Sequence, residues 1–108
     1  MVKINGETWR ILLVSPNHPM LMRSNGDFTL GACDDIVKGI YISDSLSKDK
    51  FKKVLCHELT HAAMYSYNVE LSVEQEELLA DLIATYGQEI IRETNRIFIR
   101  LKRDGLLN

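Results

Sequence analysis

The stretch "VLCHELTHAA", residues 54–63, contains two of the three histidines of this 108-residue chain. It lies inside a longer segment, from about Ser47 to Tyr67, in which apolar residues recur at the spacing of one helix face. Either Ser47 or Asp49 can cap the start of such a helix. At roughly 100° per residue, the stripe that faces the core consists of Phe51, Val54, Leu55, Ala62 and Tyr65. The stretch therefore predicts a helix with one buried face.

Glu58 and the two histidines of this helix form an H-E-x-x-H pattern. Glu58 projects into the middle of the apolar stripe, where an unpaired carboxylate is costly to bury. His57 and His61 are one turn apart and side by side, so both imidazoles can bind one metal ion. Zinc hydrolysis requires two such imidazoles and a nearby carboxylate, which takes a proton from the water at the open coordination position. A metal-free helix with two partly exposed histidines would leave the position of Glu58 unexplained.

A catalytic zinc site normally has three protein ligands, so a third must come from elsewhere in the chain. One candidate is His18, in a loop flanked by prolines. The others are acids of a second predicted helix, Glu74, Glu76, Glu77 and Asp81. Glu77 and Asp81 share a face, which suits a ligand and a carboxylate that holds a histidine N–H, whereas periodicity places Glu76 closer to the apolar sector. These acids could also face water, so the spacing leaves the choice open.

The second helix has clear end signals. It begins at Ser72, which is expected to form a capping box with Gln75. It continues to about Asp104, and Gly105 is expected to stop it. Gly87 can kink this helix or divide it into two.

The first half of the chain predicts short strands. An Asn-Gly turn at residues 5–6 indicates a hairpin, and the strand over residues 9–15 is stopped by two prolines. Further strands are expected over residues 28–32 and after Gly39. Strands followed by helices indicate a single α+β domain spanning residues 1–108. We expect a small antiparallel sheet of three or four strands, then the H-E-x-x-H helix and a long C-terminal helix or helix pair.

Composition excludes several classes of protein. Apolar residues make up 45% of the chain and charged residues 26%, which excludes disordered and fibrous classes. The net charge of -2 favours neither nucleic acid nor an anionic membrane as a partner. No apolar run is long enough to span a bilayer, and the start, "MVKINGETWR", lacks the apolar region of a signal peptide. We therefore expect a cytoplasmic protein in which Cys33 and Cys56 are reduced.

The motif "HELTH", followed by "EELLAD" at residues 76–81, resembles the gluzincin metallopeptidases, whose third zinc ligand is a glutamate on a following helix. Within that group the chain is most similar to the ImmA/IrrE-type metallopeptidases of phages and mobile elements, which carry H-E-x-x-H and then E-x-x-A-N. Glu77, Ala80 and Asp81 match the second motif, with aspartate in place of the usual asparagine. The resemblance implies a minimal zincin fold, a peptide or protein substrate, and a phage or mobile-element origin.

The resemblance also implies roles residue by residue. It assigns one Zn²⁺ per chain to His57, His61 and Glu77, with Glu58 as the catalytic base and Asp81 orienting a ligating histidine. The chain shows no helix-turn-helix or sensor segment like those of longer relatives, so their repressor substrates do not carry over. The chain also resembles very small gluzincins, some of which are latent because their C-terminal segment covers the site, and residues 100–108 could do the same.

Other features point to chemistry less specifically. Peptide hydrolysis needs a donor that stabilises the oxyanion, and the candidates are Tyr65, Tyr67, Tyr86 and His18. Each of these residue types is more common as packing or surface. The strand near Tyr41 could bind an extended peptide by strand addition.

Four arginines form a basic stripe on the second helix, opposite Ile90, Ile97 and Leu101: Arg92, Arg96, Arg100 and Arg103. A solvated helix face explains such a stripe, because positive charge suits a helix C-terminus. An acidic partner or nucleic acid is the alternative.

These observations favour a zinc-dependent metallopeptidase that hydrolyses peptide bonds through a metal-activated water. One rival is a catalytically silent protein that keeps the zincin fold and binds a partner. Another is a phage interaction protein that acts through the basic stripe. Only the peptidase needs the carboxylate of Glu58, so this residue separates the three hypotheses.

Overall fold

In the computed structural model, which describes residues 1–107, the Asn-Gly turn at residues 5–6 forms the predicted hairpin. Strands β1 (Val2–Ile4) and β2 (Glu7–Val14) pair antiparallel on either side of the turn. Asn5 and Gly6 have φ angles of 49° and 79°. Positive φ at both central residues is what a type I′ hairpin turn requires, and Asn-Gly adopts it most easily.

The strands form one mixed sheet in the order β1-β2-β4-β3. Strands β3 (Gly31–Asp34) and β4 (Gly39–Ser43) form an antiparallel hairpin, but β4 pairs with β2 in parallel. The α+β class and the small sheet are confirmed, whereas the sheet is not purely antiparallel. β4 takes the inner position because it is apolar enough to be covered on both faces, as strands in parallel pairs usually are.

Helix α1 (Lys48–Ser66) lies across one face of the sheet, and the main core forms between them. The completely buried residues of this core are Trp9, Ile40, Ile42 and Ala62. The indole Nε1–H of Trp9 donates a 2.8 Å hydrogen bond to Ser66 Oγ. This bond ties the C-terminal end of α1 to β2, so the sheet positions the H-E-x-x-H helix.

The opposite face of β4 is covered by the chain between β2 and β3. This segment includes a short 3-10 helix, η1 (Pro19–Leu21), in which Leu21 is completely buried. The ring of His18 stacks on that of Tyr41 in β4, with centroids 5.9 Å apart. Tyr41 therefore lies in an inner strand, and the prediction that its strand could bind a peptide at a free edge was wrong. The free edge next to β4 belongs to β3.

The remaining helices follow the predicted end signals. Helix α2 (Val73–Leu82) begins with the capping box of Ser72 and Gln75. A π-helical turn, η2 (Ile83–Gly87), separates it from α3 (Gln88–Arg103), as the division at Gly87 predicted. Gly105 has a φ of +71°, and the N–H of Leu106 donates to Leu101 O at 3.0 Å. This left-handed turn ends the helix, as predicted.

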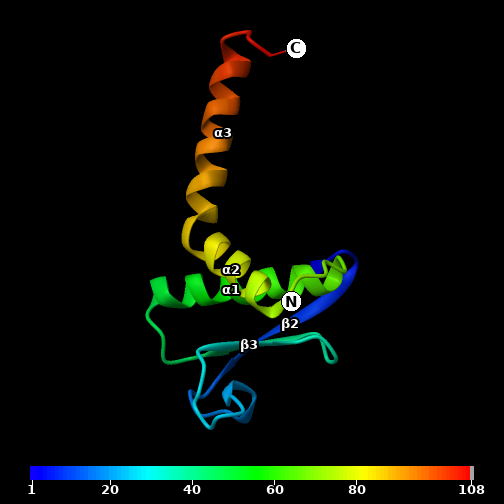
Figure 1. Ribbon diagram of the computed structural model, residues 1–108. Coiled ribbons are helices and arrows are strands. Elements are labelled where there is room, and N and C mark those ends of the chain that lie inside the picture. Colours follow the sequence, from blue (N-terminus) through cyan, green and yellow to red (C-terminus); the bar gives the residue numbers. More distant parts are fainter. Residues whose placement is uncertain (108) are drawn as a thin grey trace.

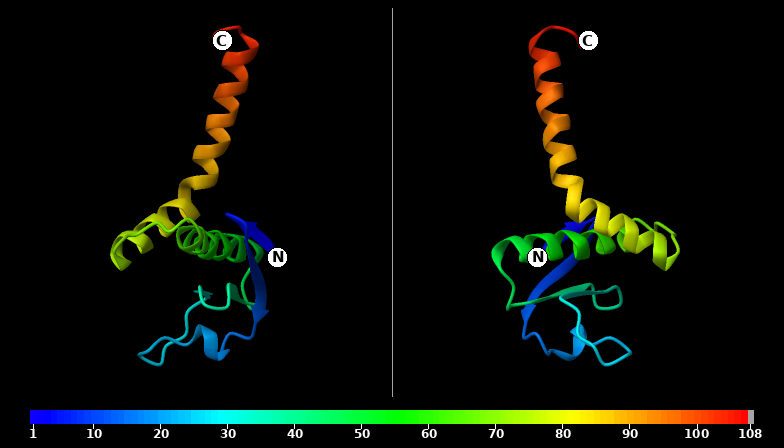
Figure 2. Two further views of the ribbon diagram at one scale, coloured as in Figure 1. Left: turned by 90° about the vertical axis from the view of Figure 1, so that its right-hand side faces the viewer. Right: turned by 60° about the vertical axis from the view of Figure 1, so that its left-hand side comes forward.

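Figure 1 shows α1 between the sheet and α2, with α3 extending away from all of them. The two further views in Figure 2 agree: α3 stands apart from the sheet along its whole length. The C-terminal residues through 107 therefore lie far from the H-E-x-x-H segment and do not cover it. Within residues 1–107, none of the helices has the length and apolar character that crossing a membrane demands.

Candidate metal centre

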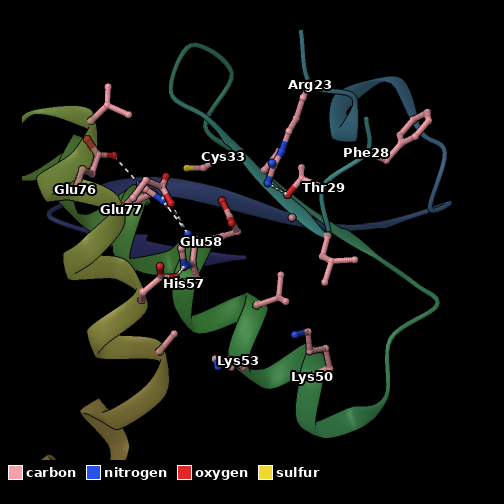
Figure 3. A pocket seen from close by; sticks show the side chains of 18 of the residues that line it. Arg23, Phe28, Thr29, Cys33, Lys50, Lys53, His57, Glu58, Glu76 and Glu77 are labelled. Atoms are coloured by element: carbon pink, nitrogen blue, oxygen red, sulfur yellow. Dashed lines mark hydrogen bonds and ion pairs between the residues drawn. The ribbon is translucent and has the colours of Figure 1, made fainter. Parts of the chain in front are cut away.

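The candidate site forms where α2 lies against α1, next to β3. Helix α1 supplies His57, Glu58 and His61 from the predicted motif. Figure 3 shows Glu76 and Glu77 projecting from α2 toward His57 and Glu58 of α1. The capping box at the start of α2 sets where this helix begins. The packing of α2 against α1 then decides which of its acids face the histidines.

Three potential ligand atoms converge at the centre of the site. His57 Nε2 lies 3.1 Å from His61 Nε2 and 3.2 Å from Glu77 Oε2, and His61 Nε2 lies 3.0 Å from Glu77 Oε1. Two ligands bound tetrahedrally to zinc at about 2.0–2.1 Å would lie about 3.3–3.4 Å apart. These three residues could therefore hold a metal ion with little movement of their side chains.

Each histidine is also held on its far side by a carboxylate. His57 Nδ1 lies 3.0 Å from Asp81 Oδ1, and His61 Nδ1 lies 2.6 Å from Glu76 Oε1. A carboxylate in this position accepts the Nδ1–H of a neutral imidazole, so we assign the lone pair to Nε2 in both rings. Both lone pairs and the Glu77 carboxylate then face one point, with no proton between them. A cation held at that point would remove the repulsion among the three acceptors.

The neighbouring acids Glu76 and Glu77 have different surroundings. The side chain of Glu77 is 52% exposed and reaches both histidines, whereas that of Glu76 is 21% exposed and lies beside His61 alone. Glu77, and not Glu76, is thus in the group that could hold a metal. Periodicity placed Glu76 nearer the buried side, which is confirmed. The contact of Glu76 with His61 was not predicted. The sequence offered one signal for it, because a carboxylate near the apolar sector of a helix needs a partner.

Glu58 is the buried carboxylate of the site, with 7% of the residue exposed. Gly31 of β3 lies against it: a Cβ added at Gly31 would be 3.0 Å from Glu58 Cγ and 3.2 Å from Oε2. The missing side chain at Gly31 thus leaves room for the carboxylate. Burial raises the pKa of the Glu58 carboxyl above its ordinary value; the two histidines oppose the rise and Glu77 adds to it. A raised pKa makes the ionised carboxylate a better base.

The site opens into a cleft of about 1190 Å³. One wall is the free edge of β3, including Gly31, and the chain that precedes it. The acids of α2 line one end. Away from them the lining has three basic residues, Arg23, Lys50 and Lys53 (Figure 3), and one acid, Asp27. The cleft is therefore negatively charged at the metal centre and positively charged farther along α1.

The predicted oxyanion donors do not all reach this cleft. Tyr65 lines it, whereas Tyr67, Tyr86 and His18 are outside its lining. The pKa of Tyr65 is raised, first by partial burial and then by Glu76, so its hydroxyl stays protonated and can donate. His18 is occupied elsewhere, because its Nδ1 accepts the backbone N–H of Met20 at 3.1 Å.

Both cysteines are free thiols. The thiol of Cys56 faces Ile83 O at 4.0 Å, which agrees with the prediction that this residue points away from the histidines. Cys33 lines the cleft, and burial, followed by nearby carboxylates of which Glu58 is the first, raises its pKa to about 12. Its thiol is therefore protonated at neutral pH and is a poor metal ligand in that form.

No family model, curated protein or solved structure matches the chain.

Proposed function

We propose that this protein is a zinc-dependent metallopeptidase that hydrolyses peptide bonds. The observation that supports it best is the convergence of three acceptor atoms, from His57, His61 and Glu77, beside the buried carboxylate of Glu58. A purely structural pair of histidines needs neither the third acceptor nor a buried carboxylate. The resemblance of the motifs to ImmA/IrrE-type enzymes supports the same proposal, including an origin in a phage or mobile element.

The donor set suits zinc. Two imidazoles and one carboxylate, with a fourth position left open, are a common ligand set of catalytic zinc. When bound, zinc would lower the pKa of a coordinated water to about 7 and polarise the substrate carbonyl. Asp81 and Glu76 keep the imidazoles in the tautomer that binds metal through Nε2, so these two residues act by positioning the ligands.

Glu58 would carry the proton. Its carboxylate accepts a proton from the attacking water and delivers it to the leaving amine nitrogen as the peptide C–N bond breaks. The raised pKa of Glu58 helps the second half of this transfer, because a carboxylic acid with a higher pKa is present over a wider pH range.

The cleft suits an extended peptide. The free edge of β3 offers backbone N–H and C=O groups to which a peptide can add as a further strand, directly beside Glu58. Among the predicted oxyanion donors, Tyr65 is the one that lines the cleft, and its hydroxyl is protonated and can donate.

The test combines metal analysis with one conservative substitution. Elemental analysis of the purified protein should find about one zinc per chain. The wild-type protein should generate new amino termini in a denatured protein mixture, read by mass spectrometry. Glu58→Gln should keep the zinc and reduce the cleavage rate by about 10²–10⁴-fold, because only the proton carrier is lost.

Glu74→Gln is the matched control, since it removes the same charge from an exposed position in the first turn of α2, outside the cleft lining. It should change neither zinc content nor cleavage. A folded wild-type protein without bound metal at neutral pH would overturn the proposal. Cleavage that survives Glu58→Gln unchanged would remove the catalytic role of this residue.

A catalytically silent binding protein is the second candidate. The specific observation that favours it is helix α3, in which none of the apolar residues is buried within residues 1–107. A protein of this kind would bind zinc without cleaving any denatured protein, and Glu58→Gln would leave all of its measured properties unchanged.

A further inference from the structure

Helix α3 has nothing packed against it in the described chain. None of its residues is buried, and Figures 1 and 2 show it extending alone from η2. It has 16 residues, so it is about 24 Å long. An isolated helix of this length is marginally stable in water, and most helices in proteins are held by packing of their apolar face. α3 therefore needs a partner surface.

The apolar residues of α3 form a seam with the spacing of a coiled coil. Ile90, Thr94, Ile97 and Leu101 follow one another at intervals of four, three and four, which matches the a and d positions of a heptad. Thr94 is compatible with this seam, because its hydroxyl donates to Ile90 O at 2.7 Å. The seam is widened on one side by two further exposed apolar residues, Ile91 and Phe98.

The charges of α3 are divided along its length. The acids, Glu89 and Glu93, lie in the N-terminal half. The bases lie in the C-terminal half, with the exception of Arg92: Arg96, Arg100, Lys102 and Arg103. Two copies of such a helix attract each other when they run antiparallel, because each acidic half meets a basic half. They repel each other when they run parallel.

We propose that α3 pairs with α3 of a second copy of this chain in an antiparallel coiled coil. Antiparallel pairing places a positions opposite d positions, so Ile90 faces Leu101 of the second copy and Thr94 faces its Ile97. On one side of the seam Ile91 packs against Phe98 of the second copy. On the other side Glu93 meets its Arg100.

The opposite orientation loses these contacts. In a parallel pair Glu93 would face the apolar ring of Phe98 in the second copy, and the basic ends would lie side by side. Two-fold symmetry generates every contact of the antiparallel pair twice, so one register gives two ion pairs and a seam in which Thr94 faces Ile97 in both central layers. The cleft lies at the opposite end of the molecule from the tip of α3, so the pairing is independent of the proposed peptidase activity.

The test measures the mass of the full-length wild-type protein in solution by sedimentation equilibrium between about 1 and 200 μM, with dimer the expected species at the upper end. Glu93→Arg and Arg100→Glu should each raise the dimer dissociation constant by about tenfold, because each places two like charges across the seam at two symmetric sites. The double variant Glu93→Arg/Arg100→Glu should restore it to within about threefold of wild type. Lys3→Glu, an exposed change on β1, is the control and should have no effect.

Other results would overturn the proposal. A wild-type protein that stays monomeric at 200 μM excludes the pairing. A dimer whose charge variants are not rescued by the double variant excludes this register. A monomer that binds vesicles containing anionic lipid assigns the face to a membrane surface instead. Circular dichroism and zinc content of each variant show that the rest of the fold is intact.

Discussion

Helices α1 and α3 are similar in length, with 19 and 16 residues, but they lie in opposite surroundings. α1 has the sheet on one side and α2 on the other, whereas α3 follows η2 and extends away from both the sheet and α1 (Figure 1). The buried residues of α1 are Glu58, His61, Ala62, Met64 and Ser66. α3 has no buried residue. Its apolar and polar residues nevertheless lie on more clearly separate faces than those of α1.

The difference shows what an amphipathic pattern can and cannot predict. In a helix such as α3, apolar and polar residues lie on separate faces, and the apolar face contributes to stability only when it is shielded from water. Helix α1 instead places Glu58 and His61 on its buried face. It therefore buries less apolar surface, but it positions side chains that can take part in chemistry. The mixed pattern of α1 is therefore the stronger indication of function.

The largest expected effect is on the free energy of unfolding, when the same Ile→Ala substitution is made in the core and on α3. Ile42→Ala, in the core beneath α1, should lower the free energy of unfolding by about 2–5 kcal/mol, because it removes a completely buried side chain. Ile97→Ala on α3 should change it by less than about 0.5 kcal/mol at concentrations where the chain is monomeric. Urea unfolding, followed by the fluorescence of the single tryptophan, Trp9, measures both. Equal losses of unfolding free energy would show that α3 unfolds together with the core, and would contradict the contrast between α1 and α3.

A smaller effect is expected from the residues that hold the histidines. Glu76→Ala and Asp81→Ala should each weaken zinc binding by about 10–100-fold, because each removes the side-chain oxygen that accepts the Nδ1–H of one imidazole. Glu89→Gln, which removes an acid from α3, should leave the affinity unchanged. Competition against a chromophoric chelator measures the three constants. An unchanged affinity in Glu76→Ala would mean that His61 is oriented by packing alone.

The smallest effect concerns the ends of two helices. Ser72→Ala removes the capping box of α2 and should destabilise the protein by about 1 kcal/mol. It should also weaken zinc binding slightly, because α2 carries Glu77. Gly105→Ala places a Cβ at a φ of +71°, so it should fray α3 and reduce helical circular dichroism without changing zinc binding. A loss of zinc affinity in Gly105→Ala would show that the two regions are coupled.

Much of the local structure could be predicted from the sequence. The signals at Ser47, Ser72 and Gly105 placed the ends of three helices, because capping depends on side chains and backbone groups only a few residues apart. The pairing of His57 with His61 was predictable for the same reason. Neighbouring positions on one helix are set by its 3.6-residue period.

Contacts between distant segments could not be predicted in the same way. The parallel pairing of β4 with β2 depends on which strand is covered on both faces, and no short-range pattern contains that information. The prediction that a peptide binds at the strand of Tyr41 failed because β3 occupies that edge. The role of Glu76 depends on the position of α2 above His61, which becomes visible only once the two helices are packed.

The sequence by itself determined the α+β class, the helix ends, and the H-E-x-x-H arrangement of His57, Glu58 and His61, because these depend on local spacing. The motif resemblance favoured Glu77 over Glu76 as a ligand, but only the tertiary structure decided that Glu77 contacts both histidines while Glu76 contacts His61 alone. It also decided that the edge beside the site belongs to β3, and that α3 is left uncovered. The reason is physical: a helix period fixes which side chains lie together on one element, whereas the packing of whole elements fixes which of them meet.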